Sequence, residues 1–171
     1  LLGESPSPEL VEHIEHTVMS YPEVLGVHDL MVHDYGPGHQ FASLHIEFPA
    51  EADPLEAHDI IDNIERDFLK KDHLQVTLHY DPIVTSDAAV GILRSRLMEK
   101  ARQMDPRLSI HDLRIVPGDS HTNVLFDLVL PAGYAGDKVE LLAQLEQFIK
   151  EQDTAYSCII KVEQSYTAAH K

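Results

Sequence analysis

The sequence has little of what marks secreted, disulfide-bonded or membrane-spanning chains. Among its 171 residues are no tryptophan and one cysteine, Cys158, which excludes an internal disulfide framework and fits a reducing compartment. No window approaches the roughly 20 consecutive apolar residues of a transmembrane helix, and no N-terminal segment indicates a secretion signal. Residues 1–4 contain no initiator methionine, which predicts that the chain is part of a longer polypeptide.

Basic side chains are also scarce. The chain carries 13 Lys and Arg against 29 Asp and Glu, a net charge of −16, which argues against nucleic acid or anionic lipid as a partner. Residues 1–85 hold 17 acidic and 3 basic side chains, whereas residues 86–171 hold 12 acidic and 10 basic ones. Of the 12 histidines, 9 lie in the first half. An acidic half rich in histidine indicates a cation-binding function.

The chain contains an internal repeat. Segments 27–30, 48–50 and 58–65 recur as 110–113, 130–132 and 139–146, at offsets of 83, 82 and 81 residues. Three matches in the same order indicate a tandem duplication. We therefore expect two copies of one module, residues 1–85 and 86–171, joined by a linker over residues 82–87.

Each copy has the periodicity of helix, strand, strand, helix, strand. Helices that cover one face of a small sheet make the fold class α+β. Ser5 or Ser7 can cap the first helix, and Asp53 with Pro54 opens the second. The predicted elements are 8–20, 26–33, 41–48, a helix from residue 54, and 74–81 in copy one, then 88–104, 109–116, 122–130, 137–151 and 156–163 in copy two.

Strand alternation places three potential metal ligands on the sheet face away from the helices. His45 is out of phase with the apolar residues of 41–48, and His79 and Asp81 are out of phase with those of 74–81. His79 and Asp81 point the same way, roughly 7 Å apart. Two imidazoles and a carboxylate suit Zn²⁺, and also Mn²⁺, Fe²⁺, Co²⁺ or Cd²⁺.

Periodicity leaves two further histidines open. His28 has the phase of the inward residues Leu30 and Val32, so it can reach the outward face only through a late strand start or a β-bulge. His58, near the start of the second helix, could reach the end of the sheet. Taken singly, a histidine on a polar strand face is more often a solvated side chain. His13 and His16, three residues apart on the first helix, could form a metal-binding pair, but a solvated helix face is the more common outcome.

Other chemistries fit less well. Ser43, His45 and Asp81 could form a catalytic triad on paper, but no nucleophile turn supports one. The turn at residues 36–38 is not a phosphate loop, because its proline lacks an amide donor and no helix follows. We therefore expect no enzymatic activity; a metal-dependent hydrolase would need a general base that the sequence does not offer.

Four segments of copy one resemble a known family. They are 26–30 (GVHDL), 43–47 (SLHIE), 56–58 (EAH) and 78–82 (LHYDP). In this order, over about residues 9–84, they are similar to the C-terminal cytoplasmic domain of the cation diffusion facilitators. The resemblance implies an αββαβ fold, ferredoxin-like and similar to metallochaperones.

The resemblance also implies a function. The family's exporters have six transmembrane helices, absent here, and their cytoplasmic domains form homodimers that bind regulatory divalent cations. The chain would then be the cytoplasmic domain of an integral protein of the plasma or inner membrane. By the same resemblance, the ligands of a two-ion site near the dimer interface are His28, His45, His58, His79 and Asp81, with Asp81 bridging. A free-standing metallochaperone or metal buffer is the alternative, which the absent initiator methionine disfavours.

Copy two departs from this ligand pattern. His111 matches His28, but the other four positions hold Asp127, Val139, Lys161 and Glu163. A lysine ammonium has no lone pair to donate to a metal, and its positive charge partly neutralises the two carboxylates. The outward strand face also gains Leu125, Val129 and Ile159, which predicts an exposed apolar patch. We therefore expect copy two to bind no metal and to serve in packing or dimerisation.

Overall fold

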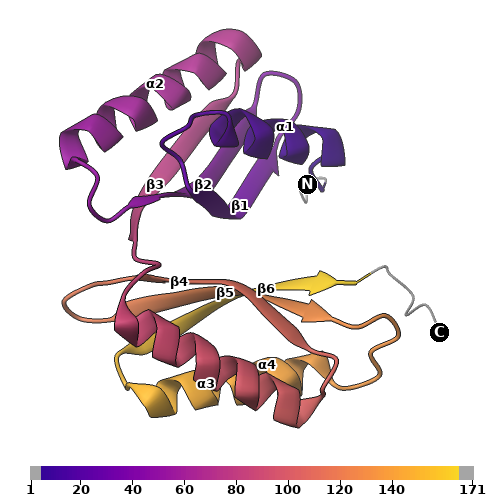
Figure 1. The fold of residues 1–171 in the computed structure, drawn as a ribbon. Coiled ribbons are helices and arrows are strands. Elements are labelled where there is room, and N and C mark those ends of the chain that lie inside the picture. Colours follow the sequence, from indigo (N-terminus) through magenta and orange to yellow (C-terminus); the bar gives the residue numbers. More distant parts are fainter. Residues whose placement is uncertain (1–4, 166–171) are drawn as a thin grey trace. The chain divides into compact units, whose positions relative to one another are not determined.

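The computed structural model describes residues 5–165, which form two compact units, each with its own hydrophobic core (Figure 1). The first unit ends at Pro82 and the second begins at Ile83; we name them module one and module two. Residues 1–4, on which the expected fragment start rests, lie outside the described residues. Among residues 5–165, every helix is too short or too polar to cross a membrane.

Module one has the predicted order helix, strand, strand, helix, strand. Both helices lie on one face of a three-stranded sheet of order β1-β2-β3 (Figure 1). Ser7, not Ser5, caps the first helix by accepting a hydrogen bond from the Leu10 amide, and Asp53 caps the second. The elements are α1 (Pro8–Met19), β1 (Gly26–Asp34), β2 (Gln40–Pro49), α2 (Pro54–Asp72) and β3 (Gln75–Ile83).

Module two repeats this architecture, which confirms the α+β fold of two related modules. Its sheet has the order β4-β5-β6, with β4 antiparallel and β6 parallel to the central β5. Asp87 and Asp137 cap its two helices. The elements are α3 (Ala88–Met104), β4 (Ser109–Val116), β5 (Thr122–Leu130), α4 (Lys138–Gln152) and β6 (Tyr156–Gln164).

The central strand of each sheet supplies the core by alternation. In β2, the residues that face the helices are almost fully buried, and β5 contributes in the same way. These residues are Ala42, Leu44, Ile46 and Phe48 in β2, and Val124, Phe126, Leu128 and Leu130 in β5. Because one face of each sheet is committed to the helices, the other face carries the polar side chains of interest.

The first strand of each module contains a β-bulge. In module one the pairing of β1 with β2 shifts between His28 and Met31, and Asp29 between them has a left-handed φ of 52°. In module two the shift lies between His111 and Arg114, and Asp112 has a φ of 53°. Aspartate tolerates the left-handed region better than most residues. The bulge is therefore a shared feature of the fold, present with and without the metal-ligand pattern.

The segment predicted as a linker is partly structured. Strand β3 continues to Ile83, and Val84 forms an isolated antiparallel bridge with Ile115 of β4, with two backbone hydrogen bonds. The stretch without a strand, bridge or helix is therefore residues 85–87, which is shorter than the linker expected over residues 82–87.

The prediction of an exposed apolar patch on β5 is wrong for Leu125. This side chain is only 1% exposed, while Val129 and Ile159 are half-buried. Leu125 lies in the central strand, paired with Arg114 on one side and Ile159 on the other, so neighbouring side chains flank it. Alternation gave the face of Leu125 correctly but not its depth.

Cys158 in β6 is expected to react slowly with alkylating reagents. Burial, with a smaller contribution from the nearby Glu146 carboxylate, raises the pKa of its thiol to about 12. The smaller thiolate fraction outweighs the higher nucleophilicity, so alkylation at pH 8 should be tenfold or more slower than in the denatured chain. Mass spectrometry of iodoacetamide-treated protein, with and without denaturant, measures this; equal rates would contradict it.

Candidate metal centre

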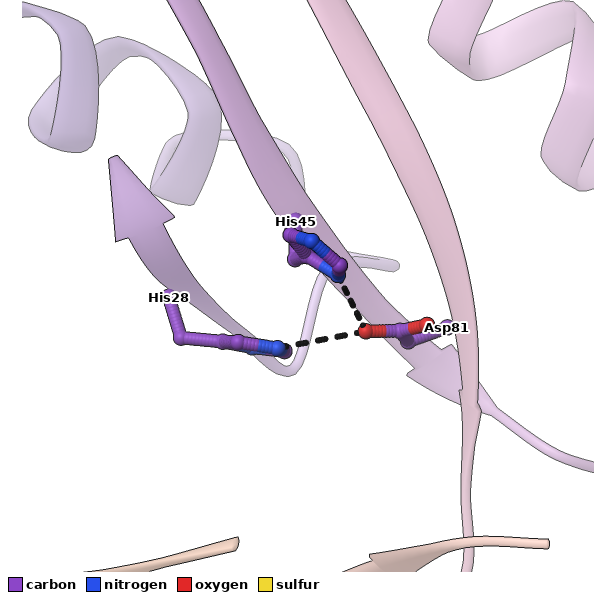
Figure 2. Close-up of side chains that lie close together, drawn as sticks. All are labelled: His28, His45 and Asp81. Carbon is purple, nitrogen blue, oxygen red and sulfur yellow. Dashed lines mark hydrogen bonds and ion pairs between the residues drawn. The ribbon is translucent and has the colours of Figure 1, made fainter. Parts of the chain in front are cut away.

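Three potential ligands converge on the polar face of module one. His28 comes from β1, His45 from β2 and Asp81 from β3, and both imidazoles turn toward the same carboxylate (Figure 2). Asp81 Oδ2 lies 2.8 Å from His45 Nδ1 and 3.2 Å from His28 Nε2. One ligand atom from each residue lies within 4.8 Å of the other two.

The bulge brings His28 to this face. Phase alone would turn His28 toward the helices, together with Leu30 and Val32. The register shift after His28 changes this phase, so that His28 lies opposite His45 with the two ring centroids 4.7 Å apart. The sequence left two ways for His28 to reach this face, a late strand start or a β-bulge, and the structure contains the bulge.

The centre is well shielded from solvent. The side chain of His28 is 8% exposed and that of Asp81 7%, whereas His45 is 32% exposed. The buried Nε2 of His28 has no hydrogen-bond partner, because its 3.2 Å approach to Asp81 lacks hydrogen-bond geometry. A buried polar atom without a partner is unfavourable and fits a site built for another ligand.

Burial and charge act against each other in this centre. Burial lowers the pKa of His28, but its contacts with the Asp81 and Glu47 carboxylates outweigh this and raise the pKa to about 9. Burial raises the pKa of Asp81, but its close contacts with His28 and His45 hold it below its usual value. The two groups therefore form an ion pair at neutral pH in the metal-free protein.

This ion pair makes the stability of metal-free module one depend on pH. Protonated His28 stabilises the folded state fully below the ordinary histidine pKa of about 6.5, and this stabilisation is lost as the pH rises through 9. The contribution of Asp81 is present above its ordinary pKa of 3.8 and is lost at lower pH. A metal ion bound to His28 would displace this proton, and its coordination bond would then replace the ion pair between His28 and Asp81.

The other two expected ligands lie further out. His79 Nε2 is 3.5 Å from Asp81 Oδ1, and its ring centroid is 4.5 Å from that of His45, but its side chain is 67% exposed. His58 lies in the second turn of α2 and is exposed. Within residues 5–165, the close group of metal-ligating atoms consists of His28, His45 and Asp81. His58 as a ligand stays a prediction from the family resemblance.

These residues fit a divalent transition metal. Two imidazole nitrogens and one carboxylate oxygen form a donor set that zinc and its neighbours accept. Ligand atoms of a tetrahedral zinc site lie about 3.3 Å apart, given zinc–ligand bonds of about 2.0 Å. The contacts of Asp81 Oδ2 at 2.8 and 3.2 Å are close to that spacing. A hollow lined by His45, His79 and Ser43 opens beside the group.

At the equivalent place in module two, arginine and lysine side chains lie beside the carboxylates. Asp127 pairs with His111 across the strands, as His45 pairs with His28. Arg114 Nη1 lies 4.0 Å from Asp127 Oδ1, and Lys161 contacts Glu163 at 3.1 Å. Burial raises the pKa of Asp127, although Lys161 and Arg114 lower it.

Sequence reasoning missed two residues of these faces. Glu47 shares the strand phase of His45 and therefore lies on the polar face, but this phase does not predict its burial; Glu47 is 1% exposed, and its Oε2 lies 3.3 Å from His28 Nδ1. Arg114 directly follows the bulge region of module two, and strand periodicity did not predict its position beside Asp127. The spacing of Glu47 two residues after His45 was the available signal for its face, and no sequence signal gave its burial.

Several other histidines of module one have local roles. His13 Nε2 contacts Asp72 at 3.1 Å, His33 stacks on Tyr35, and His73 ends α2 in a left-handed conformation. These contacts account for part of the histidine content of this module.

Module one matches the model of a known protein family. The family described as "cation efflux protein, cytoplasmic domain" matches residues 6–83, from the start of α1 to the end of β3. Module one is similar to this cytoplasmic domain along nearly its whole length. The match contains all five residues of the expected ligand set.

Two relatives of this chain are transporters by name. An uncharacterised transporter of Methanocaldococcus jannaschii is 32% identical over an 82-residue alignment that covers 42% of this chain and 29% of that protein. The cation-efflux pump FieF of Yersinia enterocolitica is 35% identical over 72 residues, 42% of this chain and 24% of that pump. The chain therefore spans less than a third of either relative.

Proposed function

We propose that this chain is the regulatory cytoplasmic part of a divalent cation efflux transporter, and that module one binds the regulatory ion. His28, His45 and Asp81 hold the ion, with His79 and His58 as outer ligands of a second one. The bound ion supplies positive charge and coordination bonds to a module whose acidic residues repel one another. The partners are divalent cations, a second copy of the chain and a transmembrane portion of the same polypeptide.

The observation that carries this proposal is the convergence of three ligands from three strands. His28 and His45 contact one buried carboxylate, and reaching it requires the bulge at Asp29. A solvated surface histidine would need neither the bulge nor the burial. The family match supports the setting, since cation efflux proteins handle cations.

We assign no metal site to module two. There the strand positions of the ligands hold Asp127, Lys161 and Glu163, with Arg114 beside the carboxylate. Of the apolar patch expected from the sequence, Val129 and Ile159 are half-buried and so remain partly accessible on this face. We propose that module two serves in packing or dimerisation, on a surface smaller than the one the sequence predicted.

Titration of the whole chain with Zn²⁺ and Mn²⁺, with the molecular mass measured before and after, tests both assignments. We expect metal binding that survives Asp127→Ala, because module two contributes no ligand. We also expect a dimer in chelator at neutral pH, because apolar contacts rather than metal coordination hold the two chains together. A monomer in chelator would make the ion itself the link, and loss of binding in Asp127→Ala would place a site in module two.

A further inference from the structure

Glu47 is a buried carboxylate that lies behind the ligand group, not inside it. Its Oε2 is 3.3 Å from Nδ1 of His28, while Nε2 of the same ring faces Asp81 (Figure 2 shows the His28–Asp81 contact). The side chain of Glu47 is 2% exposed. A buried carboxylate with this placement needs a reason, since removing a charge from water is unfavourable unless it is compensated.

A neutral imidazole can bind a metal through only one nitrogen at a time. If the proton sits on Nε2 of His28, the nitrogen that faces Asp81 has no lone pair to offer. A carboxylate that accepts the Nδ1–H hydrogen bond keeps the proton on the far side of the ring. We propose that Glu47 is a positioning residue that holds His28 in the tautomer and orientation needed for metal binding. This inference rests on the proposed metal site.

Gly26 provides the space for this carboxylate. It pairs directly with Glu47 across β1 and β2, and a Cβ at Gly26 would lie 2.7 Å from Glu47 Oε2. The φ of Gly26 is not left-handed, so the backbone itself does not require glycine there. Glycine at this position therefore serves the close approach of the Glu47 carboxylate.

Module two provides an internal comparison. Its cross-strand pair at the same register is Ser109 and Val129, in place of Gly26 and Glu47. The glutamate is absent where the metal-ligand pattern is absent, and so is the glycine. In module two the Ser109 hydroxyl contacts the histidine ring instead, with its Oγ 3.1 Å from His111 Nε2. The Gly–Glu pair thus accompanies the ligands and not the fold, because the bulge is kept in both modules.

The test measures Zn²⁺ affinity of the full chain and its Glu47→Ala, Glu47→Gln and Gly26→Ala variants. Loss of a carboxylate behind a histidine ligand typically weakens metal affinity tenfold to a hundredfold, which we expect for Glu47→Ala. Glu47→Gln should stay within about threefold of the native chain, because the amide oxygen still accepts the Nδ1–H bond. Gly26→Ala should weaken binding in the native chain but add no further loss to Glu47→Ala, because it acts through the same carboxylate.

Glu65→Ala is the matched control. Glu65 is another partly buried glutamate of module one, and its Oε1 accepts a hydrogen bond from the Leu78 amide at 2.8 Å. We expect this variant to lower the unfolding midpoint without changing metal affinity. The second readout is the ¹⁵N chemical shifts of the His28 ring in the Zn²⁺-loaded chain: a protonated Nδ1 and a metal-bound Nε2 in the native protein, and loss of that pattern in Glu47→Ala.

The outcomes separate the two proposals. If the native chain binds no Zn²⁺, the proposed function fails, and this inference fails with it. If the native chain binds and Glu47→Ala binds equally well with unchanged His28 shifts, only this inference is overturned. Affinity that falls equally in Glu47→Ala and Glu65→Ala would also overturn it, because the effect would then follow from stability alone.

Discussion

Asp81→Ala is expected to reduce Zn²⁺ affinity at least a hundredfold. The carboxylate is the common contact of the site, 2.8 Å from His45, 3.2 Å from His28 and 3.5 Å from His79. Removing it deletes one ligand and the group that orients two others, whereas a single-histidine variant deletes one ligand and leaves the rest in place. We therefore expect a smaller loss for His28→Ala, measured by competition with a chromophoric chelator.

The matched control for this variant is Asp72→Ala. Asp72 also pairs with a histidine of module one, His13, at 3.1 Å, but on the helices and apart from the ligand group. Its removal should leave Zn²⁺ affinity unchanged. If affinity survives Asp81→Ala and collapses in His28→Ala, the order of importance is wrong and the centre is organised around the imidazole.

Zn²⁺ affinity should keep rising with pH well beyond the ordinary titration range of histidine. The pKa of His28 is about 9 in the metal-free protein, so its ring is protonated at pH 7.5. Zn²⁺ needs the neutral ring, so each pH unit below 9 weakens binding about tenfold through this one group. Between pH 6.5 and 8.5 the contribution of His28 alone is about a hundredfold.

Calorimetry in two buffers of different ionisation enthalpy measures the protons released on binding. At pH 7.5 we expect close to one proton per ion from His28, with less released as the pH approaches 9. His13→Ala should leave the release unchanged, because its contact with Asp72 lies outside the ligand group. An affinity that levels off above pH 7 would show that His28 is already neutral and that its contacts with Asp81 and Glu47 are weaker than the structure indicates.

Most of the fold could be predicted because local chemistry marks its boundaries. Asp53 and Pro54 start α2 as expected, and helix α3 and strands β4 and β5 have the predicted bounds. Strand alternation gave the correct face for the core of β2. It could not give depth, since burial depends on which side chains flank a residue from neighbouring strands, as Leu125 between Arg114 and Ile159 illustrates.

The candidate site was predictable only in part, for the same kind of reason. His45, His79 and Asp81 follow from a period of two, and the structure brings them close. His28 required a bulge, which a strict period of two excludes, so only the family resemblance pointed to it. The burial of Glu47 and its contact with His28 depend on the room that Gly26 leaves on another strand, and a pattern within one strand contains no such information.

The repeated bulge also bears on how fast the domain can respond to a cation. Module two keeps the left-handed aspartate and the register shift although its ligand positions have changed, so this backbone shape forms without help from an ion. In module one the strands that carry His28 and His45 therefore need no refolding when an ion arrives. The rate of binding is then set by the loss of the His28 proton and of water from the ion, and both steps are far faster than the rearrangement of a sheet. Such a site can follow a sudden rise in cation concentration while it is still occurring.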